Sequence, residues 1–302
     1  MKIKKIPLLL LLNSLFIFSS SCKRDVPDTD ISDNESPEEL IDDNSDNNVM
    51  DDDSNDETNE GSDEEANNGT LLAEASFEGT MHPFKNEYDG ADIHTDPTAP
   101  DGAQVLRFTY PSGHPSGYSP DLAWIWFEQG SYEVKAEYHF KYSENFYFHR
   151  IDNKQVYLDI GDQTNFFLSA VDTNYIGGVG INTELNFVCQ YGNIGSAIRA
   201  TPNMSQVTIS PNIWYKVTLY FKLNTDSHPN GLLKIWLNDK PIMDYTDIVF
   251  NTDSEANKPF TCLKFDPVWG GVGGPKPEST DYFYIDAVKI WSGPFTILHQ
   301  PE

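Results

Sequence analysis

The sequence predicts an all-β fold in which two antiparallel sheets pack as a sandwich. Apolar and polar residues alternate with period two in many segments after residue 70. No segment shows a convincing helical period, and turn-forming residues separate the alternating segments. About a dozen short strands with turn signals between them are typical of a jelly-roll sandwich.

Two long segments show the alternation most clearly. Residues 132–142 carry an apolar or aromatic residue at every even position and a polar residue at every odd one. That pattern is typical of a strand with one buried face. Residues 214–223 repeat it, and the residues expected to face the core are Tyr215, Val217, Leu219, Phe221 and Leu223.

Shorter strands are expected around these two. Residues 232–237 and 241–242 flank Asn238-Asp239-Lys240, which predicts a tight hairpin turn. Further strands are expected at residues 105–110, 156–160, 166–171, 186–191, 261–265 and 283–290. Roughly 230 residues remain after the N-terminal segments, enough for one domain with a large core.

The N-terminus predicts export and lipid anchoring. A basic start is followed by an apolar stretch at residues 6–18 and by small residues that lead to Cys22. The stretch is too short to span a membrane. Residues 1–21 resemble a bacterial lipoprotein signal peptide, which implies that Cys22 is lipidated and that the protein sits outside the cytoplasm, at the outer membrane or cell surface. The alternative is an ordinary secretory signal with an incidental cysteine.

Residues 22–70 are predicted to form a disordered acidic tether. Residues 25–70 hold 19 Asp and Glu, no Lys or Arg and no aromatic residue. Such a segment cannot bury enough apolar surface to fold, and its charges repel one another. A calcium-binding segment is the alternative, but the EF-hand spacing is missing. Residues 71–302 are therefore the expected folded domain.

Charge and cysteine content exclude several classes of partner. The chain has 47 acidic and 20 basic residues. The first 70 residues hold 19 acidic and 5 basic ones, which leaves 28 and 15 and a net charge of −13. This balance disfavours nucleic acid, although a local cationic groove for an acidic glycan is compatible with it. Cys189 and Cys262 either form a disulfide or remain buried free thiols.

The order of motifs resembles the concanavalin A-like jelly roll of bacterial polysaccharide lyases. The resemblance is strongest to the alginate- and glucuronan-lyase-like group and to relatives of heparin lyase I, and it covers nearly all of residues 75–292. The hairpin at 230–240 also occurs in non-catalytic sugar-binding domains. The Asn153-Lys154 strand entry and the glycine-rich loop after Trp269 point to the lyase group. In this loop, Trp269 offers a flat surface on which a sugar could stack.

A uronate lyase must neutralise the substrate carboxylate, remove the adjacent proton and protonate the leaving oxygen. The segment 146–157 holds suitable side chains close together. The candidate catalytic residues are His149, Arg150, Lys154, Tyr157 and Tyr220, and the candidate substrate-binding residues are Gln190, Tyr191, Lys222 and Trp269. The alternative is a polar loop and strand edge with no joint geometry.

A calcium ion is the only cofactor expected, and its role would be structural. Jelly-roll relatives hold such an ion between their terminal strands, and Glu78 and Asp286 supply suitable oxygen ligands. The alternative is a pair of ordinary acidic residues at strand ends. The chemistry itself requires no cofactor.

Three functions from different classes are compatible with the sequence. The first is a surface-anchored lyase that cleaves a uronic-acid-containing polysaccharide by β-elimination. The second is a non-catalytic glycan-binding lipoprotein, and a third is an adhesive surface protein without a sugar ligand. A lyase predicts that His149, Lys154, Tyr157 and Tyr220 converge in one groove. A binding module predicts a platform of exposed aromatics, drawn from Trp124, Trp126, Trp236 and Trp269. The expected partners are an acidic polysaccharide and a membrane through the lipid anchor only, and the protein is expected to be a monomer.

Overall fold

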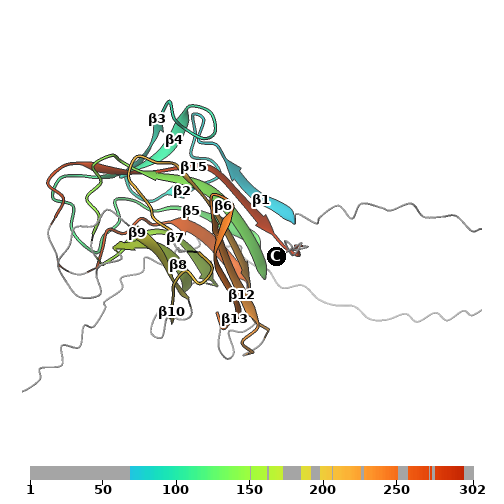
Figure 1. The fold of residues 1–302 in the computed structure, drawn as a ribbon. Helices are drawn as coiled ribbons and strands as arrows, with labels where there is room; N and C mark the ends of the chain where they lie inside the picture. Colours follow the sequence, from blue (N-terminus) through green and yellow to red (C-terminus); the bar gives the residue numbers. More distant parts are fainter. Residues whose placement is uncertain are drawn as a thin grey trace, which may run out of the picture.

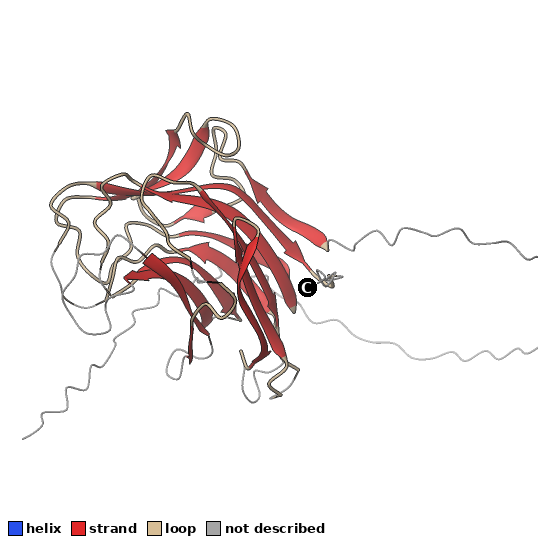
Figure 2. Ribbon diagram, viewed as in Figure 1, coloured by secondary structure: helices blue, strands red, loops and turns tan. Residues whose placement is uncertain are grey.

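The alternating segments fold into the predicted strands. The computed structural model describes residues 69–149, 151–161, 163–172, 185–191, 198–205, 207–225, 228–250, 258–271, 273 and 276–295. Within these residues there are fifteen strands and no helix (Figure 1, Figure 2). The described part of the chain therefore contains no helix long and apolar enough to cross a membrane.

Eight strands form one antiparallel sheet, which we call sheet A. Its strand order is β13-β12-β11-β6-β15-β4-β3, with β1 also paired to β15 (Figure 1). The strands are β1 (Thr70–Ala75), β3 (Ala91–Thr95), β4 (Gln104–Tyr110), β6 (Glu133–Tyr142), β11 (Tyr215–Lys222), β12 (Gly231–Leu237), β13 (Lys240–Ile248) and β15 (Asp281–Ser292).

Seven strands form the second antiparallel sheet, sheet B, in the order β10-β9-β8-β7-β14-β5-β2. These strands are β2 (Lys85–Asn86), β5 (Ala123–Ser131), β7 (Asn153–Ile160), β8 (Gln163–Asp172), β9 (Leu185–Tyr191), β10 (Ile198–Ala200) and β14 (Phe260–Phe265). Neighbours such as β7 and β14 are far apart in sequence, so long-range pairing defines the sheet. The predicted all-β sandwich of two antiparallel sheets is confirmed.

The inner faces of the two sheets share one core that is rich in aromatic rings. Tyr138 and Phe140 of sheet A are buried, and the Tyr138 ring meets Phe265 of sheet B edge-on, with 5.2 Å between centroids. Such edge-on pairs add to the burial of apolar area that drives the sheets together. The predicted inward residues of 214–223 all lie in this core.

The predicted hairpin turn is present between β12 and β13. Leu237 pairs with Lys240, which leaves Asn238 and Asp239 as a two-residue loop. Their φ angles are 50° and 63°. Positive φ at both central residues defines the turn whose twist matches paired strands, and Asn and Asp tolerate it better than most residues.

The alternation missed the strands β1, β2, β3, β5 and β10. In β5, residues 124–127 are all apolar and so show no alternation. Both faces of the strand are apolar here, because the two tryptophans lie on the outer face and Phe127 enters the core. The expectation that Tyr132 faces the core was also wrong. Tyr132 falls in the bend between β5 and β6 and is 57% exposed, so the buried alternation of β6 begins at Val134.

Candidate functional site

One row of register positions across sheet B holds residue types suited to glycan recognition. The pairing register places them directly opposite one another from strand to strand, and opposed residues share a face. From β10 to β2, this central row consists of Arg199, Gln190, Phe167, Tyr157, Lys264, Trp124 and Lys85. Cationic, amide and aromatic residues thus follow one line across an acidic protein.

A β-bulge in β7 brings Lys154 onto the same face as Tyr157. Residues three apart on a regular strand point to opposite faces. Here the register shifts between Lys154 and Val156. Gln155 turns into the core and hydrogen-bonds to two buried tyrosine hydroxyls. The bulge therefore re-aims one side chain, as bulges beside functional sites do.

Lys154 and Tyr157 meet over a single aromatic ring. The Lys154 ammonium lies 4.8 Å from the centre of the Phe167 ring, and the Tyr157 ring lies 5.4 Å from it. Lys154 is only 9% exposed, and among the described residues no carboxylate forms an ion pair with it. A nearly buried ammonium without a paired anion is costly. The position therefore favours a ligand that brings a carboxylate.

Lys264, on the next strand, is held differently. Its ammonium donates to Asp159 Oδ2 and to Thr164 Oγ1, both at 2.9 Å, and it lies 5.5 Å from the centre of the Tyr157 ring. Lys264 and Asp159 are each 1% exposed. Because its charge is already paired with Asp159, Lys264 stabilises the position of the Tyr157 ring and is not expected to bind a ligand anion.

Two titratable groups near Lys154, Asp266 and Tyr157, have pKa values that differ from their usual ones. Burial raises the pKa of Asp266 to about 6, although Lys264, a Ser119 hydrogen bond and Lys154 act in the opposite direction. Burial, with the nearby Asp266 as a smaller cause, raises the pKa of Tyr157 well above its usual value. At neutral pH, Asp266 is therefore a carboxylate while Tyr157 keeps its proton. An acid and a base with separated pKa values are what proton transfer requires.

His149 lies close to this region but is locked into a loop. The Ile151 amide donates to its Nδ1 at 3.2 Å, so Nε2 carries the proton and faces the Gly273 carbonyl oxygen at 3.1 Å. Its ring packs edge-on against Trp269, with 4.8 Å between centroids. With both nitrogens engaged, His149 holds the loop in place and offers no free lone pair to a substrate.

Trp269 does not form the expected stacking surface. It is 1% exposed, its indole Nε1 donates to the Tyr147 carbonyl oxygen at 2.8 Å, and it packs against the core. The following Gly270 has φ +76°, and a Cβ there would collide with the His149 ring. Trp269 and His149 therefore form a packed unit, which we call the plug, because the tryptophan ring points inward.

The predicted groove of four converging residues does not form. Tyr220 and Lys222 lie on β11 of sheet A, facing away from the core, whereas Lys154 and Tyr157 lie on the outer face of sheet B. The Tyr220 hydroxyl donates to Glu133 Oε1 at 2.5 Å, and Lys222 Nζ lies 3.7 Å from Glu133 Oε2. The sandwich separates these residues, so only two of the four share a site.

Other predicted site residues are placed only by backbone position or lie outside the described residues. Gln190 occupies the central row opposite Phe167, and Tyr191 stands one position along β9, opposite Phe166. Arg150 and Cys22 lie outside the described residues.

Glu78 and Asp286 bind the same turn. Glu78 Oε1 accepts from the amides of Ala103 and Gln104, both at 2.7 Å, and Asp286 Oδ2 accepts from the Asp101 amide at 2.9 Å. Burial raises the pKa of Asp286 to about 6. Within the described residues, no group of three or more His, Cys, Asp or Glu is arranged to hold a metal ion. The calcium site remains a prediction.

The tryptophans do not form one platform. Trp124 and Trp126 lie on the outer face of sheet B against Leu122 and Cys262, while Trp236 lies on sheet A. The Cys262 thiol is buried and is not part of a disulfide. Two strands separate its strand, β14, from the β9 strand of Cys189, about 14 Å at the usual strand spacing, which excludes a disulfide.

Sequence reasoning missed Lys264, Asp159, Asp266 and Arg199 as site residues. Asp159, Lys264 and Asp266 stand within or next to predicted strands, and Arg199 lies on β10, which was not predicted. The order of strands within sheet B decides which of them meet. Lys264 stands between Leu263 and Phe265, a pattern that could have indicated a side chain facing away from the core. The sequence therefore indicates which face of a strand a side chain is on, but it does not indicate which strands lie next to each other in sheet B.

No family model and no curated protein matches the sequence. Solved structures do match. A double mutant of the alginate lyase Aly36B in complex with an alginate trisaccharide has a TM-score of 0.50 and 17% identity, covering 75% of this chain and 99% of that chain. An endo-β-1,4-glucuronan lyase from the fungus Trichoderma reesei has a TM-score of 0.49 and 15% identity, covering 70% and 90%. An alginate lyase from Chlorella virus has a TM-score of 0.49 and 11% identity, covering 69% and 91%. The protein shares the jelly-roll β-sandwich fold of these polysaccharide lyases.

Proposed function

We propose that the protein is a polysaccharide lyase that cleaves a uronic-acid-containing glycan by β-elimination on the outer face of sheet B. The observation that carries this proposal is the Lys154 ammonium, nearly buried over Phe167 beside Tyr157 and without an ion-pair partner among the described residues. A uronate carboxylate is an anion that such a position would bind and neutralise.

The neighbouring groups suit the remaining steps. Lys154 would bind the carboxylate and so acidify the proton on the adjacent carbon. Asp266, ionised above about pH 6, would accept that proton. The released electron pair would form a carbon–carbon double bond as the bond from the neighbouring carbon to the glycosidic oxygen breaks. Tyr157, which keeps its proton, would donate it to that oxygen.

The central row supplies a binding line for the rest of the glycan. Gln190 and Arg199 hold register positions on one side of Tyr157, and Trp124 and Lys85 on the other. Cationic and aromatic residues on one line fit a chain of acidic pyranose rings. The matching structure of Aly36B holds an alginate trisaccharide, which makes alginate a natural first substrate to test.

A second candidate function is glycan binding without cleavage. It is favoured by the fixed position of His149, whose ring nitrogens are both engaged within the loop. In that case Lys154 and the central row would still hold an acidic glycan, and no bond would break.

The N-terminal sequence sets the proposed location. The basic and apolar start, Cys22 and the acidic tether support a lipid-anchored protein outside the cytoplasm, at the outer membrane or cell surface. A long tether would let the sandwich reach polysaccharide away from the membrane.

The test is to incubate the purified full chain with alginate, glucuronan and heparin-type polysaccharide and follow the ultraviolet absorbance of unsaturated uronate. We expect product from at least one substrate, and a loss of about a hundredfold or more in kcat/KM for Lys154→Ala, in line with removal of one electrostatic stabiliser. Lys222→Ala, which removes an exposed lysine of sheet A, is the control and should keep its activity. Binding without product would favour the second candidate, and neither binding nor product would overturn both.

A further inference from the structure

The amide side chain of Gln155 lies in the core between the two sheets. Gln155 is fully buried, its Oε1 accepts from the Tyr138 hydroxyl at 3.2 Å, and its Nε2 donates to the Tyr142 hydroxyl at 2.9 Å. Both tyrosines lie on β6 of sheet A and are themselves buried. A buried amide without partners is costly, so these two bonds favour the inward position of Gln155. The bulge in sheet B is therefore held from the opposite sheet.

The backbone of the bulge also holds Asp266. The Asp266 amide donates to the Gln155 carbonyl oxygen at 3.2 Å, and the Lys154 amide donates to the Val268 carbonyl oxygen at 3.1 Å. These bonds extend the pairing of β7 with β14 beyond Phe265. Burial is the main influence on the pKa of Asp266, which it raises, and Lys154 is close enough to act in the opposite direction. Gln155 thus connects the core to the group proposed to bind the carboxylate and to the proposed base.

Tyr138 contacts both strands that carry these groups. Its hydroxyl donates to Gln155 on β7, and its ring packs edge-on against Phe265 of β14, with 5.2 Å between centroids. Phe265 directly precedes Asp266 in the chain. Because a close-packed interior transmits displacements, a change in this contact would move Lys154 and Asp266 relative to each other.

We infer that Gln155 is a positioning residue for the proposed β-elimination: its bonds to Tyr138 and Tyr142 fix the bulge and so set the position of Lys154 relative to Asp266. The inference rests on the proposed function, because it assigns a role within that site. Misplacement of reacting groups by about 1 Å can lower a rate by about a hundredfold. The effect of losing Gln155 should appear in kcat more than in KM, because Lys154 is still present to bind the carboxylate.

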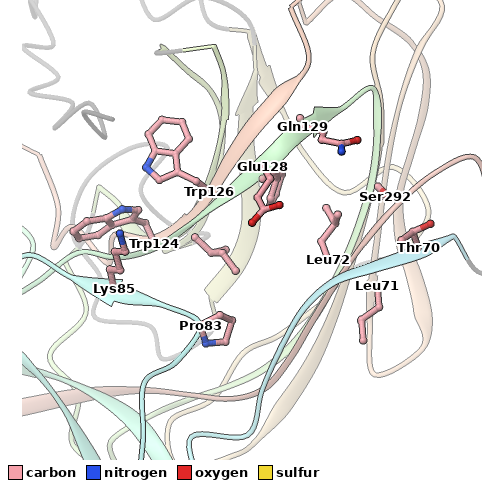
Figure 3. A pocket seen from close by; sticks show the side chains of 13 residues that line it. Thr70, Leu71, Leu72, Pro83, Lys85, Trp124, Trp126, Glu128, Gln129 and Ser292 are labelled. Atoms are coloured by element: carbon pink, nitrogen blue, oxygen red, sulfur yellow. The ribbon is translucent and has the colours of Figure 1, made fainter. Parts of the chain in front are cut away.

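Gln129 and Tyr215 provide matched controls. Gln129 lies on β5, is exposed, and lines an open cavity of about 730 Å³ between β1 and β5 (Figure 3). Gln129→Met therefore makes the same chemical change as Gln155→Met outside the core. Tyr215 is a buried tyrosine of sheet A whose hydroxyl accepts from the Ser210 amide at 2.9 Å. Tyr215→Phe removes a core hydroxyl that does not bond to Gln155.

The test measures kcat and KM of the full-length protein with a polysaccharide that the unaltered protein cleaves. We expect Gln155→Met to lower kcat about tenfold to a hundredfold and to change KM by less than about threefold. Tyr142→Phe should lower kcat about threefold to tenfold, in line with the loss of one hydrogen bond. The double variant should be no slower than Gln155→Met alone, because both changes act through the same bond. Gln129→Met and Tyr215→Phe should keep nearly full activity.

Unchanged kcat in Gln155→Met would overturn the positioning role while leaving the proposed function intact. An equal loss in Tyr215→Phe would also overturn it, because a general weakening of the core would then explain both. If Gln155→Met fails to fold, Tyr142→Phe decides by the same comparison of kcat with KM. If the unaltered protein cleaves no uronic acid polymer, the proposed function fails and the positioning role falls with it.

Discussion

At the scale of single residues, the site depends on two lysines with opposite roles. Lys264 is neutralised by Asp159, whereas Lys154 lies over an aromatic ring with no ion-pair partner among the described residues. The sequence presents both as polar residues of strands. The difference comes from their neighbours, because a paired buried charge supports structure and an unpaired one attracts a ligand.

Asp266 links activity and stability through its pKa. Its pKa in the folded protein, about 6, lies above the ordinary value of 3.8 for an aspartate, so folding favours the protonated form. The stability that this proton contributes is present at low pH and is lost as pH rises to about 6. We expect Asp266→Asn to stabilise the protein at pH 7, by on the order of 2 kcal/mol, and to have little effect near pH 4. Urea unfolding at the two pH values measures this.

The same variant should lose lyase activity, because an amide cannot accept the substrate proton. In the unaltered protein, kcat should rise as pH increases through about 6. A variant that is more stable but equally active would show that Asp266 is a buried structural acid and that another group is the base.

At the scale of elements, the alternation predicted the long strands well because one face of each is buried. The Asn238–Asp239 turn was also evident from its residue types. The bulge at Gln155 was not evident from the sequence, because cross-strand pairing and two tyrosine hydroxyls in the core determine it. The same holds for Trp269, whose glycine-rich surroundings suggested an open loop but whose ring is buried. Local sequence reports which residues alternate, and it does not report what packs over them.

The plug formed by Trp269 and His149 should be sensitive to a single methyl group. Gly270→Ala would place a Cβ against the His149 ring at a positive φ, so we expect a loss of about 2–4 kcal/mol in unfolding free energy. Gly273→Ala is the matched control, because Gly273 also has positive φ (+82°) but open space where its Cβ would stand. It should cost only about 1 kcal/mol of backbone strain. Thermal unfolding of both variants provides the comparison, and equal costs would mean that His149 does not occupy that space.

At the scale of the whole molecule, the two sheets present different outer faces. Sheet A carries Tyr220 bound to Glu133, and sheet B carries Tyr157 beside Lys154 and Asp266. The sequence predicts both tyrosines as candidates, Tyr157 within the segment 146–157 and Tyr220 on the strand expected at 214–223. Only the order of strands assigns them to opposite faces, and our account places the chemistry on sheet B alone.

The most direct test compares Tyr157→Phe with Tyr220→Phe in the lyase assay on the full chain. Each change removes one hydroxyl oxygen from a buried tyrosine, and the two side chains lie on opposite faces of the sandwich. We expect Tyr157→Phe to lower kcat by about a hundredfold or more, as loss of a general acid does, and Tyr220→Phe to keep nearly full activity. Full activity in Tyr157→Phe, or a loss confined to Tyr220→Phe, would contradict the placement of the active site on sheet B.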